Sequence, residues 1–166
     1  MGRANVAKIN DWLWVGNCDA CKEEVSMQFV IHIFRNDKEV EGKPSQERNC
    51  QYAHRKNLRM NYLDGAELDP SNLSNLDAFI ERIRDAGPQA PHPNHTLVHC
   101  HAGMCRSPTV AIYVLSMIEE MHPIDAQNLV TKAIYEQRSG EVCNVCYPPL
   151  KQILGIWEKR FPWRQK

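Results

Sequence analysis

One segment in the second half of the chain limits the possible folds more than any other. The residues Thr96-Leu97-Val98 precede a short polar stretch, and a mostly apolar run from Pro108 to Met117 follows it. The stretch between them reads His99-Cys100-His101-Ala102-Gly103-Met104-Cys105-Arg106-Ser107. This order predicts a buried strand, a tight loop and a buried helix with proline near its start.

The predicted loop places a cysteine where its chemistry would change. The Cys100 thiol would lie near the positive end of the helix dipole, which favours the thiolate and makes the sulfur a nucleophile. The first turn of the same helix offers unpaired backbone N–H groups that can bind an anion. A nucleophile inside an anion-binding loop is suited to phosphoryl transfer through cysteine.

Strand and helix patterns alternate along the rest of the chain. Strand patterns cover residues 9–15, 29–34 and 58–62, in addition to 96–98. Helices are predicted to open at Asp69-Pro70, Ser107-Pro108, His122-Pro123 and Pro148-Pro149. This alternation predicts an α/β sandwich with a central mixed, largely parallel sheet flanked by helices. No internal repeat or boundary divides it, so we expect one domain over residues 1–166.

Composition excludes some broad classes of function. The 166-residue chain has 20 basic and 20 acidic residues, so no wide basic face for nucleic acid or membrane is indicated. There is no apolar signal core at the N-terminus and no run long enough to span a membrane. The odd count of seven cysteines argues against a fully paired disulfide framework. We therefore expect a cytoplasmic or otherwise intracellular protein in a reducing compartment.

The pattern His-Cys-x5-Arg-Ser resembles the active-site loop of the cysteine-dependent protein tyrosine phosphatase superfamily. The short chain and the run Arg106-Ser107-Pro108-Thr109 are most similar to its dual-specificity branch. Further similarity lies in residues 12–17, in Arg138 and in residues 144–147. The resemblance implies a phosphatase-like α/β sandwich that hydrolyses phosphotyrosine and phosphoserine/threonine in proteins. It implies no cofactor.

Roles for the loop residues follow from their chemistry and from this resemblance. Cys100 would attack phosphorus and form a phosphocysteine, while the planar fork of Arg106 would hold two phosphate oxygens. Gly103 lets the backbone curl so that N–H groups converge on the phosphate. The resemblance implies that Ser107 donates a hydrogen bond to the sulfur; His99 would order the loop and would not act as general base. The phosphate-binding residues would be His101, Ala102, Gly103, Met104, Cys105 and Arg106.

A general acid must protonate the leaving oxygen, because an alkoxide or phenolate leaves poorly. The resemblance implies an aspartate on a separate loop before the cysteine. Asp69 is already explained as a helix N-cap before Pro70, whereas Asp64 follows a strand end beside a glycine and has no such explanation. We therefore assign the acid to Asp64, with Asp69 and the less suitable Glu67 as alternatives.

The remaining cysteines suggest two further hypotheses. Two C-x2-C pairs, formed by Cys18, Cys21, Cys143 and Cys146, have a spacing that could hold a structural zinc ion. Small buried thiols are also ordinary core residues, so a purely structural role is the alternative. Cys105, beside Arg106, could trap an oxidised Cys100 as a disulfide, or could simply be a tolerated small residue.

Rival functions remain open within and outside the superfamily. A phosphoinositide substrate is disfavoured because residues 101–105 contain no lysine to meet extra phosphates, and an RNA 5′-triphosphate finds no support in the neutral charge. A phosphoprotein-binding module with weak activity is another class. Such modules usually lack the cysteine, the arginine or the acid, and Cys100, Arg106 and Asp64 are all present here. The sequence predicts a phosphoprotein substrate but no oligomeric state.

Overall fold

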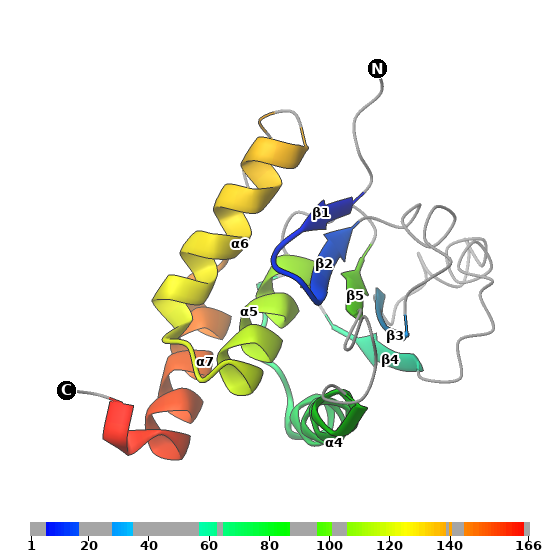
Figure 1. Ribbon diagram of the computed structural model, residues 1–166. Helices are drawn as coiled ribbons and strands as arrows, with labels where there is room; N and C mark the ends of the chain where they lie inside the picture. Colours follow the sequence, from blue (N-terminus) through cyan, green and yellow to red (C-terminus); the bar gives the residue numbers. More distant parts are fainter. Residues whose placement is uncertain are drawn as a thin grey trace.

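The computed structural model describes residues 6–16, 28–34, 57–62, 65–86, 96–100, 106–138, 140 and 145–164. The strands are β1 (Val6–Lys8), β2 (Leu13–Gly16), β3 (Phe29–Phe34), β4 (Asn57–Asn61) and β5 (Thr96–His99). The helices are α4 (Pro70–Ala86), α5 (Arg106–Ile118), α6 (Pro123–Gln137) and α7 (Tyr147–Arg160), followed by the short 3₁₀ helix η2 (Pro162–Arg164). In Figure 1 the labelled helices gather on one side of the sheet.

Within the described residues the sheet has five strands, in the order β1-β2-β5-β3-β4. Strand β5 lies at its centre and pairs in parallel with both β2 and β3, and β3 pairs in parallel with β4. Among the strands that the structure describes, only β1 and β2 pair in the antiparallel direction. The predicted mixed, largely parallel α/β sheet is therefore confirmed, and the carboxyl end of β5 lies between two strands that run in the same direction.

The strand predicted over residues 9–15 corresponds to β2, and its start differs from the prediction. Strand β2 begins only at Leu13, and residues 9–12 form the turn that joins β1 to β2. The side-chain oxygen of Asn10 accepts hydrogen bonds from the backbone N–H groups of Trp12 (3.0 Å) and Leu13 (2.8 Å). Asparagine competes in this way with strand pairing, so the apolar residues around it do not extend the strand.

Helix starts agree closely with the sequence. The carboxylate of Asp69 accepts a hydrogen bond from the Asn72 backbone N–H at 2.7 Å, which confirms Asp69 as the N-cap of α4. His122 caps α6 by accepting the Ile124 N–H at 3.1 Å. Helix α5 begins at Arg106, one residue before its predicted opening, and α7 begins at Tyr147.

Helix α5 is the centre of the core. Every residue from Arg106 to Met117 is buried, because the helix packs against β2 and β5 and is also in contact with α4, α6 and α7. The strand face that meets these helices carries Phe29, Ile31 and Ile33, while the alternate residue Val30 is buried outside this cluster. None of the helices in the described ranges is long and apolar enough to cross a membrane.

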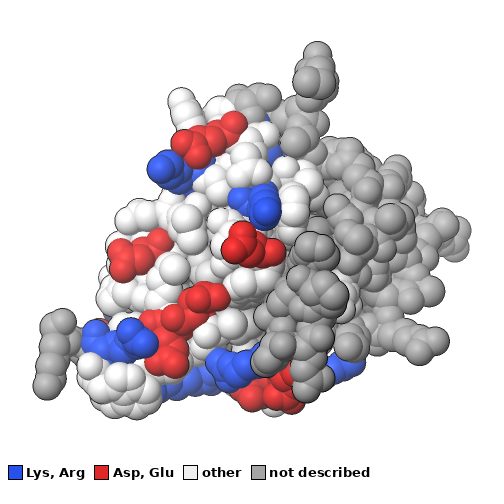
Figure 2. Space-filling model, viewed as in Figure 1, with Lys and Arg blue, Asp and Glu red and all other residues white. Residues whose placement is uncertain are grey.

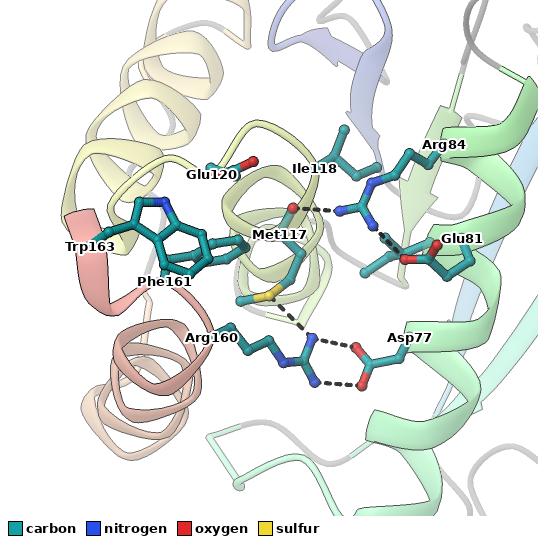
Figure 3. Close-up of a pocket in the computed structure, with 10 residues that line it drawn as sticks. Asp77, Glu81, Arg84, Met117, Ile118, Glu120, Arg160, Phe161 and Trp163 are labelled. Atoms are coloured by element: carbon teal, nitrogen blue, oxygen red, sulfur yellow. Dashed lines mark hydrogen bonds and ion pairs between the residues drawn. The ribbon is translucent and has the colours of Figure 1, made fainter. Parts of the chain in front are cut away.

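The C-terminal half of α5 is joined to its neighbours by polar contacts, and Figure 3 shows those made by Arg160 and Arg84. Tyr113 on α5 donates its hydroxyl to Asp77 of α4 at 2.5 Å, and Arg160 of α7 donates to both oxygens of Asp77 at 3.1 and 2.7 Å. Arg84 of α4 donates to the carbonyl of Met117 at 2.7 Å. A pocket of about 680 Å³ is lined by Asp77, Arg84, Met117, Arg160, Phe161 and Trp163, among others. Charges of both signs are interspersed on the described surface in Figure 2.

Candidate active site

The candidate nucleophile lies at the carboxyl end of the central strand. Cys100 directly follows β5, and its backbone N–H donates to the carbonyl of Gly16, the last residue of β2, at 3.3 Å. Arg106 and Ser107 are the first two residues of α5. The fold thus brings the cysteine, the helix N-terminus and the arginine backbone to the same edge of the sheet, as the sequence predicts.

A short chain of contacts joins the thiol to the helix. The Sγ atom of Cys100 lies 3.4 Å from the Oγ atom of Ser107, and the Ser107 hydroxyl donates to the carbonyl of Gly16 at 3.3 Å. Cys100, Arg106 and Ser107 are all buried. The serine hydroxyl is therefore within reach of the sulfur and could turn its hydrogen toward a thiolate.

His99 forms a buried pair with a histidine of the neighbouring strand. Its Nε2 atom lies 2.8 Å from Nδ1 of His32 on β3, and the two rings meet edge to face with centroids 4.7 Å apart. Burial, and then the proximity of His32, lowers the pKa of His99 from 6.5 to about 3. His99 is therefore neutral at neutral pH and a weak base, which agrees with assigning it no general-base role.

Several predicted site residues lie outside the described residues, and their assignments stay predictions. These are the acid Asp64, the loop residues His101, Ala102, Gly103, Met104 and Cys105, and the zinc candidates Cys18, Cys21 and Cys143. Of the four zinc candidates, Cys146 is described, at the N-cap of α7. A Cβ atom added to Gly65, the residue after Asp64, would lie 3.4 Å from the Sγ atom of Cys146. The chain just after the predicted acid therefore approaches the start of α7.

Two residues of this region were not identified from the sequence. Gly16 appears in the sequence analysis only within residues 12–17 of the resemblance, yet its carbonyl accepts from both Cys100 and Ser107. A glycine at a strand end often marks close backbone approach, which is the signal that could have found it. His32 appears only as part of an apolar strand, and its partnership with His99 depends on the register of β3 against β5.

Comparisons with known proteins bear on the fold. No family model matches the chain. It is similar to the crystal structure of human DUSP28, with 16% identity, a TM-score of 0.65 and coverage of 98% of this chain and 99% of that one. It is also similar to PTPMT1 in complex with PI(5)P, with 18% identity, a TM-score of 0.62 and coverage of 98% and 100%.

A third similar structure is the human tyrosine phosphatase-like serine/threonine/tyrosine-interacting protein. It is 16% identical with a TM-score of 0.64, and the match covers 95% of this chain and 97% of that one. All three matches span nearly the whole length of both chains, so the likeness includes the sheet, the helices and their order. The chain has the fold of the dual-specificity phosphatases.

Proposed function

We propose that this protein is a metal-independent protein phosphatase that hydrolyses phosphotyrosine and phosphoserine/threonine through a phosphocysteine intermediate. The observation that carries the proposal is the placement of the Cys100 sulfur, 3.4 Å from the Ser107 hydroxyl, with Arg106 as the first residue of α5. The phosphatase fold of the similar structures supports the broader class of phosphoric monoester hydrolase.

The first step would transfer the phosphoryl group to sulfur. The Cys100 thiolate attacks phosphorus, the bond from phosphorus to the leaving oxygen breaks, and Asp64 gives that oxygen a proton. Arg106 binds two of the phosphate oxygens through its planar fork as charge shifts between them. The N-terminus of α5 adds a positive dipole end at the same edge of the sheet, which favours both the thiolate and the phosphate.

The second step would release phosphate and restore the Cys100 thiolate. Water attacks the phosphocysteine and gives a proton to Asp64, while the S–P bond breaks and its electron pair returns to sulfur. The Ser107 hydroxyl, which donates to Gly16 in this structure, would turn to donate to the departing thiolate. Phosphate then leaves as the product, and the acid is protonated for the next cycle.

A substrate panel tests the assignment directly. We expect turnover of a small aryl phosphate and of phosphotyrosyl and phosphothreonyl peptides, and loss of at least about a thousandfold of kcat in Cys100→Ser with unchanged thermal unfolding. PI(5)P, seen with the similar PTPMT1, and 5′-triphosphorylated RNA complete the panel. Turnover confined to either of these would replace the protein substrate. Undiminished turnover in Cys100→Ser would refute the phosphocysteine.

The acid assignment has a matched pair of variants. Asp64→Asn should lower kcat about a hundredfold, because no proton reaches the leaving oxygen, and should allow a phosphopeptide to be trapped. Asp69→Asn keeps a capping side chain at the start of α4, so its kcat should remain near that of the wild type. The opposite result would transfer the acid role to Asp69.

A further inference from the structure

The end of strand β5 is fixed from both sides just before the candidate nucleophile. On one side the Cys100 N–H bonds to Gly16 of β2. On the other, His99 pairs with His32 across the parallel register of β5 and β3, in which the two residues are direct partners. The histidine pair thus adds a side-chain link to the backbone ladder at the last residue before the thiol.

The two histidines are on the strand face opposite to the helix-side core. In β3 the helix-side cluster contains Ile31 and Ile33, and His32 lies between them. In β5 the same alternation assigns Val98 and Cys100 to the helix side and His99 to the other side. A fixed His99 side chain therefore restrains the rotation of the strand end, and with it the direction of the next residue, Cys100.

We propose that His32 is a positioning residue for the Cys100 nucleophile, acting through its hydrogen bond to His99. The inference rests on the proposed function. His32 contributes no atom to the reaction. Its effect is to hold the ring of His99, and so the backbone that enters the catalytic loop, in one orientation.

The two nitrogens in contact limit which tautomers His99 and His32 can have together. The contact joins Nε2 of His99 to Nδ1 of His32, so one of these nitrogens must carry hydrogen and the other must accept. If His99 donates, both neutral rings carry hydrogen on Nε2; if His32 donates, both carry it on Nδ1. Unlike tautomers would oppose two N–H groups or two lone pairs at 2.8 Å. The pair must therefore share one tautomer.

Tautomers can be measured on the unaltered protein. Nitrogen-15 NMR at pH 7 should show a neutral His99 ring, because burial and His32 lower its pKa to about 3, and where the His32 ring is neutral too the two rings should share one tautomer. Two different tautomers would contradict the hydrogen bond and overturn the inference. This measurement does not depend on any variant being able to fold.

Variants test the positioning role. His32→Leu should lower kcat for an aryl phosphate about tenfold with little change in KM, and should move the pH midpoint of iodoacetate alkylation of Cys100 upward. His32→Asn can exchange a hydrogen bond near the Nδ1 position and should recover most of the kcat. Val30→Ala is the control: it opens a cavity on the same strand, two residues earlier, and should lose stability without the kinetic changes.

Two comparisons separate this inference from its alternatives. If His32 acts through His99, the double variant His32→Leu/His99→Leu should be no slower than His99→Leu alone. Equal kinetic losses in Val30→Ala and His32→Leu would mean simple destabilisation and would overturn the role. Unchanged kcat and alkylation in His32→Leu, while Cys100→Ser is inactive, would refute the inference and leave the proposed function intact. Full turnover in Cys100→Ser would instead remove the proposed function.

Discussion

At the N-terminal end of helix α5, the Cys100 sulfur lies 3.4 Å from the Ser107 hydroxyl, and the Gly16 carbonyl accepts from both residues at 3.3 Å. In the C-terminal half, Tyr113 on α5 and Arg160 on α7 bind the Asp77 carboxylate, with closest distances of 2.5 and 2.7 Å. The hydrogen bond to Asp77 is the main reason that the pKa of Arg160 is raised. The contacts in the C-terminal half are therefore shorter than the three at the N-terminal end, and they include a carboxylate–guanidinium ion pair.

The difference matches what each end would do. A thiol that forms and breaks a bond to phosphorus, and a hydroxyl that follows it, must exchange partners during each cycle. Short charge-assisted hydrogen bonds would resist that exchange. About 9 Å along the helix axis, at 1.5 Å per residue over the six residues from Ser107 to Tyr113, the Asp77 contacts join α4, α5 and α7 and need not change. The Asp77 contacts can therefore hold α5 in place while Cys100 and Ser107 exchange hydrogen-bond partners.

Removing the serine hydroxyl gives the largest effect that this comparison predicts. Ser107→Ala should lower kcat about 10- to 100-fold, the equivalent of one hydrogen bond to a charged sulfur, and should mainly slow the second step. A burst of the first product from an aryl phosphate should then precede the slow steady state. A kcat equal to that of the wild type would show that the 3.4 Å contact has no part in turnover.

The matched deletion at the other end is Tyr113→Phe. It removes one hydroxyl that donates to Asp77 and leaves both bonds from Arg160, so we expect a loss of about 1 kcal/mol in the free energy of unfolding by urea. Because Tyr113 lies about 9 Å along the helix axis from Ser107 and its hydroxyl contacts Asp77, kcat should be unchanged. A fall in kcat comparable to that of Ser107→Ala would mean that the two ends are not independent.

The two regions, His99 next to Cys100 and Tyr113 on α5, should also respond to opposite extremes of pH. The pKa of His99 is lowered from 6.5 to about 3, so its contribution to stability is present above pH 6.5 and is lost as the pH falls toward 3. The pKa of Tyr113 is raised above 10 by burial and by Asp77, so its contribution is lost as the pH rises past 10. Between pH 6.5 and about 5.5 the loss from His99 should be about 1 kcal/mol.

Urea unfolding against pH checks both responses, with one variant for each. His99→Asn should reduce the slope of stability below pH 6.5, and Tyr113→Phe should reduce it above pH 10. If both variants kept the wild-type slopes, the buried environments of these two groups would not be the source of the pH dependence.

The local signals in the sequence were reliable where chemistry within a few residues decides the outcome. Asp69 before Pro70 predicts an N-cap, and the cap is present. The run after Ser107 predicts a buried helix, and α5 is buried on all sides. The start of the strand predicted over residues 9–15 was wrong, because the Asn10 side chain accepts hydrogen bonds from the backbone N–H groups of Trp12 and Leu13.

The sequence by itself determined the nucleophile candidate, the helix that would activate it and the α/β class, since each depends on the order of neighbouring residues. Only the tertiary structure decided that Gly16 accepts from both Cys100 and Ser107, and that His32 meets His99. These contacts join residues 67 to 91 positions apart, and they exist because β2 and β3 pair with β5 in one particular register. Strand order and register are set by packing of the whole sheet, which no local pattern specifies.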